Sequence, residues 1–242
     1  MSAGRLYGVG LGPGDPELVT VKAVRVLESA PVVAFFSKTG RQGNARTIAD
    51  RWIPSSAREL PLHYPVTTEI PVSDPAYNEM LRAFYAEATE KLAAELGQGR
   101  DVALLAEGDP LFYGSFMHLY VRLKERFAVT IIPGVTGMAG CWAAAGETMT
   151  WGDDVLTVLP GTMAQDALTE SLRRTDAAVI MKVGRNCAKV RQALRDSGHY
   201  ERAIYVERGT MAGEKVMRLA DKPDDAAPYF AVVLVSGQGR RP

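Results

Sequence analysis

Residues 6–27 read LYGVGLGPGDPELVTVKAVRVL and join a short apolar run to a glycine-rich turn and then to a segment with helical periodicity. Asp15 is a residue type that caps helix N-termini, and Pro16 suits the first helical position. The apolar stripe that follows at helical spacing consists of Leu18, Val21, Val24 and Leu27. A strand, a tight turn and a helix in this order predict one unit of an α/β sheet.

The same alternation continues along the chain and predicts an α/β fold with two α/β domains. The first domain is expected over residues 1–147 and the second over 148–242, with a linker at 145–154. The expected strands are 5–10, 31–36, 102–106, 129–132, 155–159, 178–183, 203–206, 216–219 and 230–235. Helices are expected to begin at Asp15 and Asp109 and to cover about 165–173 and 186–197. Residues 37–75 are polar and poorly periodic, which predicts surface loops.

The composition excludes several classes of protein. The 28 Lys and Arg residues balance the 28 Asp and Glu residues, so a nucleic-acid partner is not expected. Because the chain has no apolar run of about 18 residues and no signal-peptide pattern at its start, we expect no membrane partner and a cytoplasmic location. The two cysteines lie far apart, and the three histidines share no ligand spacing with them. Neither a disulfide framework nor a metal site is therefore expected.

The glycine-rich loop at residues 8–20 invites comparison with nucleotide-binding loops. Such a loop lets a ligand approach the backbone and presents free N–H groups at a helix start. A dinucleotide fingerprint has the spacing G-x-G-x-x-G, whereas the glycines here lie at 8, 10, 12 and 14. The next strand also ends without an acidic residue to hold a ribose. A purely structural turn remains the alternative to a ligand site.

Two further strand ends carry similar turns, AEGDPLFYGS at 106–115 and IIPGVTGMAG at 131–140. Ligands of open α/β sheets bind beyond the carboxyl ends of strands, so the glycine-rich loop and the loop at 106–115 are expected to face one crevice. Each turn also has a structural interpretation. Asp109 is expected to cap a helix, and the small residues around Thr136 are typical of close helix packing.

Together these motifs resemble the tetrapyrrole methylases, a family of S-adenosylmethionine-dependent enzymes with two α/β domains and an active-site cleft between them. The resemblance covers nearly the whole chain. It rests on VGLGPGDPELVTVKA, EGDPLFYGS and PGVTG in the first half and on VIMKVGR and ERGT in the second. Within the family, FFSKTGRQGNARTIAD and EGDPLFYGSFMHLY are similar to the branch that methylates C20 of precorrin-2 in cobalamin biosynthesis.

The resemblance implies that both domains hold the methyl donor, S-adenosyl-L-methionine, with S-adenosylhomocysteine as the product. The implied contacts in the first half are Pro13, Gly108, Asp109, Pro110, Phe112, Thr136 and Gly137. In the second half they are Met181, Gly209, Thr210, Phe230 and Ala231. Lys182 and Val183 depart from the residues that other branches carry after the methionine. The resemblance also implies a homodimer.

The implied chemistry needs few special side chains. Transfer of a methyl group from a sulfonium is an in-line displacement that depends mainly on positioning. A proton must then leave C20, and a general base can assist. Glu107, His63 and Tyr64 are candidates by location, with helix capping and loop packing as their structural alternatives.

The implied substrate is a tetrapyrrole that carries several carboxylates. Lys38, Arg41, Arg46 and Arg51 lie in the poorly periodic segment after the second expected strand. Guanidinium groups pair with carboxylates through two hydrogen bonds, so Lys38, Arg41 and Arg46 are expected to bind the substrate. Solvated surface charge is the alternative.

The resemblance therefore predicts methylation of precorrin-2 at C20. The same reaction on the cobalt complex, methylation at another tetrapyrrole position, and protein methylation of the diphthine type are the enzymatic alternatives. A nonenzymatic nucleotide-binding module is the alternative from a different class.

Overall fold

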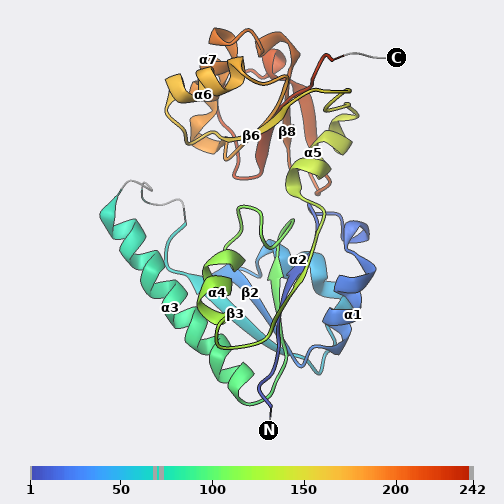
Figure 1. Cartoon of the computed structure of the whole chain (residues 1–242), viewed down its shortest axis with the longest axis vertical. Coiled ribbons are helices and arrows are strands. Elements are labelled where there is room, and N and C mark those ends of the chain that lie inside the picture. The colour runs from blue at the N-terminus through green and yellow to red at the C-terminus, as the bar shows by residue number, and fades with distance from the viewer. Residues whose placement is uncertain (1, 68–69, 71–73, 240–242) are drawn as a thin grey trace. The chain divides into compact units, whose positions relative to one another are not determined.

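The computed structural model describes residues 2–67, 70 and 74–239 and divides into two compact units, Met1–Thr136 and Gly137–Pro242 (Figure 1). Each unit contains a five-stranded sheet with helices packed on it. The α/β fold expected from the sequence is confirmed.

The first sheet is parallel throughout the described pairings and has the order β3-β2-β4-β1-β5. Its strands are β1 (Leu6–Gly10), β2 (Val32–Lys38), β3 (Arg58–Tyr64), β4 (Val102–Ala106) and β5 (Val129–Ile132). The helices are α1 (Val21–Ser29), α2 (Asn44–Ala49), α3 (Pro75–Gly97) and α4 (Phe116–Leu123). Because the strands run in one direction, the loops after β4, β1 and β5 emerge side by side at the carboxyl edge.

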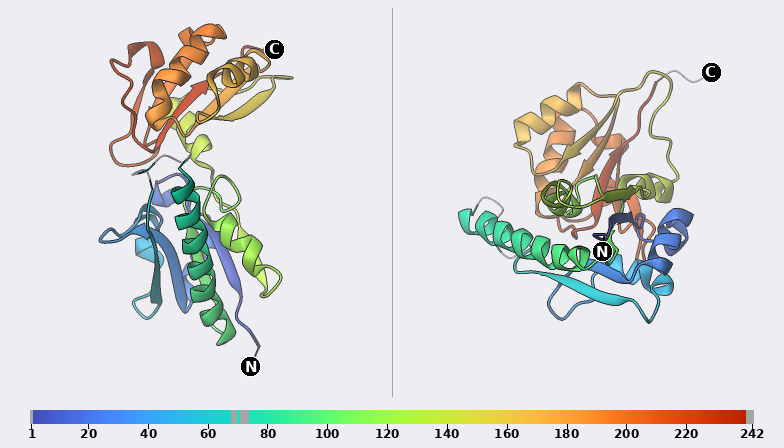
Figure 2. Two further views of the ribbon diagram at one scale, coloured as in Figure 1. Left: turned by 90° about the vertical axis from the view of Figure 1, so that its left-hand side faces the viewer. Right: turned by 60° about the horizontal axis from the view of Figure 1, so that its bottom comes forward.

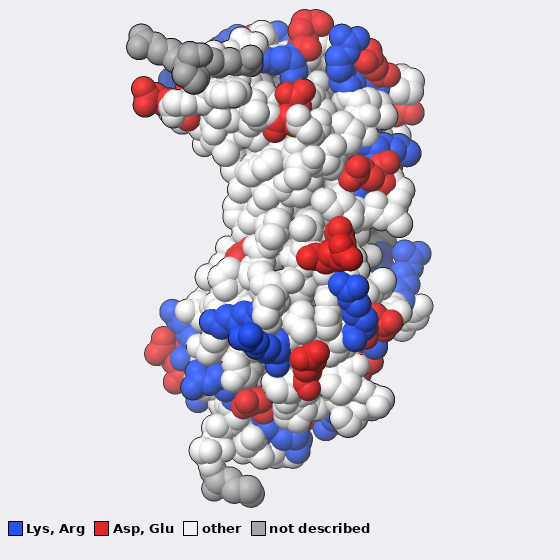
Figure 3. All heavy atoms as spheres, turned by 90° about the vertical axis from the view of Figure 1, so that its right-hand side faces the viewer, with Lys and Arg blue, Asp and Glu red and all other residues white. Residues whose placement is uncertain are grey.

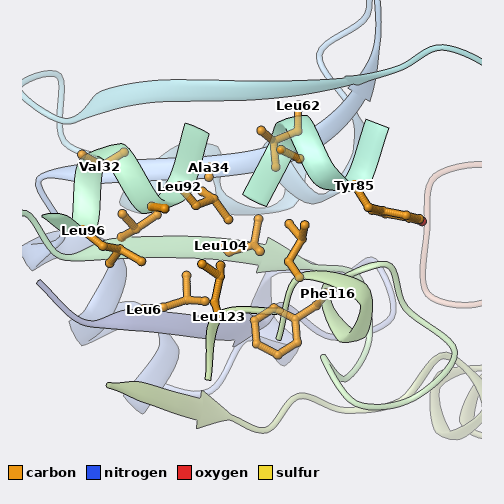
Figure 4. Close-up of a cluster of buried hydrophobic side chains, with 14 of the residues drawn as sticks. Leu6, Val32, Ala34, Leu62, Tyr85, Leu92, Leu96, Leu104, Phe116 and Leu123 are labelled. Atoms are coloured by element: carbon orange, nitrogen blue, oxygen red, sulfur yellow. The ribbon is translucent and has the colours of Figure 1, made fainter. Parts of the chain in front are cut away.

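Two helices cover each face of the first sheet (Figure 2). Strand β4 alternates its side chains, with Leu104 packed towards α3 and α4 and Leu105 packed towards α1 and α2. Figure 4 shows the first of these clusters, in which Leu92 and Leu96 of α3 lie over Leu104 and Leu6. All four of these leucines are fully buried, and each contributes about 1.5–3 kcal/mol through burial of its side chain.

The second sheet is mixed and has the order β6-β7-β10-β8-β9. Its strands are β6 (Leu156–Pro160), β7 (Ala177–Met181), β8 (Ala203–Glu207), β9 (Lys215–Arg218) and β10 (Ala231–Val235). The helices are α5 (Gly137–Ala145), α6 (Gln165–Arg173) and α7 (Cys187–Asp196). Strand β10 runs antiparallel to both β7 and β8, so its first residue lies at the edge where those two strands end.

The boundary between the units precedes α5. The sequence placed the division after residue 147, whereas the structure groups α5 with the second unit. The reason lies in packing, because Cys141 of α5 is buried against Val179 of β7, Val206 of β8 and Leu234 of β10. Residues 146–155 are irregular, but they connect α5 to β6 within the second unit, so the segment expected at 145–154 as the linker between domains does not join the two units.

Three local expectations were wrong. Asp15 caps a short 3-10 turn, Pro16–Leu18, and Thr20 caps α1 through a bond from the Ala23 N–H. The helix that was expected to begin at Asp109 is α4, and it begins at Phe116. Residues 37–75, expected to be loops, contain α2 and β3.

Candidate functional site

The three loops at the carboxyl edge of the first sheet touch through glycine backbone. A Cβ atom at Gly10 would lie 2.5 Å from the Gly134 nitrogen and 2.9 Å from the Gly108 oxygen. A Cβ atom at Gly134 would lie 2.1 Å from the same oxygen. Gly12 and Gly108 exchange backbone hydrogen bonds of 2.8 and 3.3 Å. Glycine at these positions is therefore a condition for the three loops to meet.

Asp109 joins two of the loops. Its Oδ1 accepts a hydrogen bond of 2.9 Å from the Leu111 N–H, and its Oδ2 accepts one of 3.1 Å from the Gly134 N–H. The first bond closes the turn in which Asp109 lies, and the second reaches the loop after β5. The carboxylate was expected to cap a helix, but it cross-links the strand ends.

The predicted donor-binding residues of the first unit gather at this edge. They are Pro13 in the loop after β1, Gly108, Asp109, Pro110 and Phe112 after β4, and Thr136 after β5. Gly137, the remaining residue of that set, is the first residue of α5. The glycines let the three loops pack backbone against backbone, which brings these predicted residues together at one edge.

The predicted donor-binding residues of the second unit share an edge of the second sheet. Met181 ends β7, the pair Gly209 and Thr210 follows β8, and Phe230 and Ala231 lie at the start of β10. The Arg208 N–H donates to the Phe230 carbonyl oxygen at 2.8 Å and joins two of these segments.

Close packing against α5 also requires glycine at position 209. A Cβ atom there would lie 2.9 Å from the Cys141 Cα and 3.0 Å from its Sγ. Any larger residue would push α5 away from the end of β8.

Backbone strain is concentrated in the same segments. Among the described residues, four that are not glycine have a left-handed φ, namely Tyr113, Lys182, Arg208 and Thr210, with values of 53°, 56°, 54° and 66°. Such a conformation costs about 1–3 kcal/mol and persists where the surroundings enforce it, as they often do at functional sites. One such restraint is visible at Thr210, whose N–H donates to the Glu214 Oε2 at 2.6 Å. All four residues lie in the loops after β4, β7 and β8, where the sequence predicted ligand contacts.

The three general-base candidates come from neighbouring strand ends of the first unit. Glu107 directly follows β4, and His63 and Tyr64 end β3. The His63 Nδ1 lies 2.9 Å from the Ser37 Oγ on β2. Tyr64 donates its hydroxyl proton to Ser115.

Glu107 combines exposure with a perturbed pKa. Water reaches its side chain, although protein surrounds the carboxyl group at longer range and raises its pKa through desolvation. Hydrogen bonds from the Asn44 side chain and from the backbone of Ala45 act in the opposite direction. These bonds lie at the start of α2, so the carboxylate also caps that helix, which was its structural alternative.

The basic residues after β2 fall into two groups. Arg46 lies on α2 with its side chain 11% exposed and pairs with Asp50 at 2.7 Å and Glu59 at 2.6 Å. Its guanidinium therefore serves the local fold, and the substrate-binding role expected of it stays a prediction, which the variant Arg46→Ala tests. Arg41 is exposed and Lys38 is partly exposed at the end of β2.

Figure 3 shows the two signs of charge interspersed on one face of the molecule. Within the described ranges, no three His, Cys, Asp or Glu side chains gather as a metal site requires. The helices among those residues include none that is both long and apolar enough to cross a bilayer.

Sequence analysis missed the hydroxyl contacts of Ser115. The Tyr64 hydroxyl donates to its Oγ, and the Tyr85 hydroxyl lies 3.0 Å from the same atom. The three residues lie far apart in the sequence, so local patterns carried no signal for this contact.

Two α/β units with glycine-rich loops at the strand ends are the architecture of a known class of methylases. The family model of the Tetrapyrrole (Corrin/Porphyrin) Methylases matches residues 5–221, and the chain belongs to this family.

Two curated relatives refine the comparison. The chain is 56% identical over 242 residues to a precorrin-2 C(20)-methyltransferase of Sinorhizobium sp and covers 99% of that protein. It is 28% identical over 240 residues to a cobalt-precorrin-2 C(20)-methyltransferase of Salmonella typhimurium, with 97% of each chain covered.

Solved structures share the fold. The methyltransferase CobJ aligns with a TM-score of 0.70 and 22% identity over 99% of this chain and 97% of that one. Uroporphyrin-III C-methyl transferase of Thermus thermophilus, complexed with S-adenyl homocysteine, aligns with a TM-score of 0.65 and 24% identity, and the alignment covers 96% and 97% of the two chains.

Proposed function

We propose that this methylase transfers the methyl group of S-adenosyl-L-methionine to C20 of precorrin-2, giving precorrin-3A in cobalamin biosynthesis. The observation that carries the proposal is the 56% identity, over the full chain, to the Sinorhizobium protein with that name. The motifs at the three strand ends of the first unit support it, because they lie where an α/β sheet binds ligands.

The metal-free substrate is favoured over the cobalt complex. Identity falls from 56% for the precorrin-2 relative to 28% for the cobalt-precorrin-2 relative, although the aligned lengths are nearly equal. Methylation of cobalt-precorrin-2 is the second candidate function.

The donor contacts are assigned to the two groups of strand-end residues described above. In the first unit, the close packing of the three loops at Gly10, Gly108 and Gly134 and the bond from Gly134 to Asp109 support the assignment, because they bring the predicted residues to one edge. In the second unit, Met181, Gly209, Thr210, Phe230 and Ala231 form the corresponding group. Since the methyl group of a sulfonium is already activated, these residues act by fixing its direction towards the carbon that attacks it.

Lys38 and Arg41 are proposed to bind acetate and propionate arms of the substrate. Lys38 is the last residue of β2 and Arg41 follows it, on the edge that also carries Pro13 and Asp109. Each charge-assisted hydrogen bond contributes about 1.5–3 kcal/mol, so loss of one lowers tetrapyrrole affinity roughly tenfold or more.

Glu107 suits the role of proton acceptor best among the three base candidates. A raised pKa brings a carboxylate closer to neutral pH, where a general base works efficiently. The side chain is accessible to water and directly precedes Gly108. Glu107→Gln should therefore reduce kcat more than it reduces affinity for either substrate.

The decisive experiment incubates the protein with precorrin-2 and, separately, with its cobalt complex, each with S-adenosyl-L-methionine. A gain of one methyl group at C20 of the metal-free compound, located by mass spectrometry and nuclear magnetic resonance, is the expected result. Methylation of the cobalt complex alone selects the second candidate, and methylation at another carbon refutes both.

The assembly is proposed to be a homodimer, from the family resemblance and from the general prevalence of twofold dimers. Sedimentation velocity at several protein concentrations tests this. A monomer at every concentration would contradict it.

A further inference from the structure

Three hydroxyl groups from separate elements meet beside the loop that follows β4. Tyr64 at the end of β3 donates to the Ser115 Oγ, and the Tyr85 hydroxyl of α3 lies 3.0 Å from the same atom. Ser115 thus joins two tyrosines, and we call these three residues the hydroxyl cluster. In Figure 4, Tyr85 extends from α3 with its hydroxyl at the outer end of the ring.

Aromatic packing fixes the two tyrosines. The Tyr64 ring stacks on Phe36 at 5.5 Å and contacts Phe84 at 4.9 Å. Tyr85 contacts Phe84 at 5.1 Å and stacks on His118 at 4.3 Å. Burial raises the pKa of Tyr85, so this hydroxyl keeps its proton at neutral pH. The cluster is a rigid neutral anchor for Ser115.

The loop at 108–115 is therefore held at both ends. Asp109 is bonded to Leu111 and to Gly134 at one end. Ser115 is held by the hydroxyl cluster at the other. The next residue, Phe116, is fully buried, and its ring packs so closely on Gly8 that a Cβ atom there would lie 2.4 Å away.

Between the two anchors, the loop presents apolar side chains to solvent. Leu111 is 47% exposed and Tyr113 is 43% exposed. Tyr113 has a φ of 53°, a conformation that a tyrosine adopts only under restraint. Its ring contacts the Phe112 ring edge to face at 4.9 Å. An exposed aromatic ring whose position is restrained in this way is suited to pack on the face of a flat conjugated ligand.

We infer that Tyr113 contacts a face of the tetrapyrrole ring and that the hydroxyl cluster positions it for this contact. The inference rests on the proposed function, because a conjugated macrocycle is the flat ligand which that function supplies. Tyr113 is a substrate-contacting residue, and Ser115 is a positioning residue that acts through it.

The test measures binding of precorrin-2 under anaerobic conditions for the parent protein and for Tyr113→Gly, Tyr113→Phe and Ser115→Ala. Glycine removes the ring and also relieves the strained φ, so the variant should melt no lower than the parent. Its dissociation constant for precorrin-2 should rise roughly tenfold. Affinity for S-adenosylhomocysteine should stay unchanged. Tyr113→Phe keeps the ring and should bind as the parent does.

A double mutant tests the positioning role. Ser115→Ala alone should weaken precorrin-2 binding several-fold, whereas adding it to Tyr113→Gly should change the affinity no further. An equal effect in both backgrounds would show that Ser115 does not act through Tyr113. Val121→Ala, which shortens a 57% exposed side chain on α4, is the control for general loss of apolar surface and should bind normally.

The outcomes separate this inference from the proposed function. If the parent methylates precorrin-2 but Tyr113→Gly binds it as tightly as the parent, the inference is overturned and the function stands. If the parent binds precorrin-2 without methylating it, the function is overturned and the comparison of dissociation constants still decides the inference. A parent that does not bind precorrin-2 overturns both.

Discussion

Replacement of Asp109 by alanine tests whether the cross-link between strand ends serves ligand binding. The chain provides a matched control in Asp74, which also precedes a proline and accepts one hydrogen bond, of 2.9 Å, from the residue two positions on. Asp109 makes the same bond at 2.9 Å and adds the one of 3.1 Å from Gly134. The difference between the two variants isolates the second bond.

The expected free energies follow from these contacts. Asp74→Ala loses a helix cap and should lower the free energy of unfolding by about 1 kcal/mol. Asp109→Ala loses the corresponding bond within its turn and a charge-assisted bond worth about 1.5–3 kcal/mol, so the total should be about 2–4 kcal/mol. At about 2–4 °C per kcal/mol for a chain of this size, its melting temperature should fall about 4–16 °C.

Donor affinity is the decisive measurement. Isothermal titration with S-adenosylhomocysteine, at a temperature where both variants are folded, should show unchanged affinity for Asp74→Ala and at least a tenfold loss for Asp109→Ala. Asp109→Asn keeps one acceptor oxygen and should fall between them. If Asp109→Ala melts lower but binds the donor product as the parent does, the cross-link is only structural and the reasoning about the site is refuted.

Three further changes test other features. Gly10→Ala should destabilise the first unit by about 1–3 kcal/mol or more in urea unfolding, because its Cβ would lie 2.5 Å from the Gly134 nitrogen; a parent-like midpoint would contradict the glycine contact. Arg46→Ala should lower the free energy of unfolding by about 1–2 kcal/mol, a modest value because both carboxylate partners are partly exposed to solvent. The same variant should leave tetrapyrrole affinity unchanged, whereas Arg41→Ala should weaken tetrapyrrole binding without unfolding the protein. Burial raises the pKa of Cys141 to about 11, so this thiol in the folded protein should resist alkylation by iodoacetamide at pH 8, which peptide mapping can measure. Ionisation of the thiol should reduce stability only as the pH rises from the ordinary thiol pKa towards 11.

The sequence predicted well those strands that are largely apolar runs, including β4 inside the first sheet and β5 at its edge. Residues 102–106 and 129–132 were expected as strands and are β4 and β5. Strand β3 was missed because it lies at the sheet edge and carries Arg58, Pro61 and His63, which weaken the apolar pattern. Helix α3 was not among the expected elements, since its buried face includes Thr89 and Glu95.

The features of the candidate site that depend on short sequence motifs could be predicted from the sequence. The glycine turns were expected to follow strands, and they lie at the carboxyl ends of β1 and β4, whereas the ligand contacts assigned to them stay a prediction. The sequence did not predict the cross-linking role of Asp109. Its hydrogen bond to Gly134 depends on how the sheet brings β4, β1 and β5 together. The ion pair of Arg46 with Glu59 was not predicted for the same reason, since Glu59 lies on another element.

The place of β10 has a consequence for synthesis of the chain. All strands of the first sheet have been made once residue 132 has left the ribosome, so that unit can fold while the rest is still being translated. The second sheet cannot be completed until later, because its central strand β10, which lies between β7 and β8, is the last one made. Chains that stop before residue 231 would leave the facing edges of β7 and β8 unpaired, and such edges promote aggregation. Premature termination should therefore yield a folded first unit attached to an aggregating remainder.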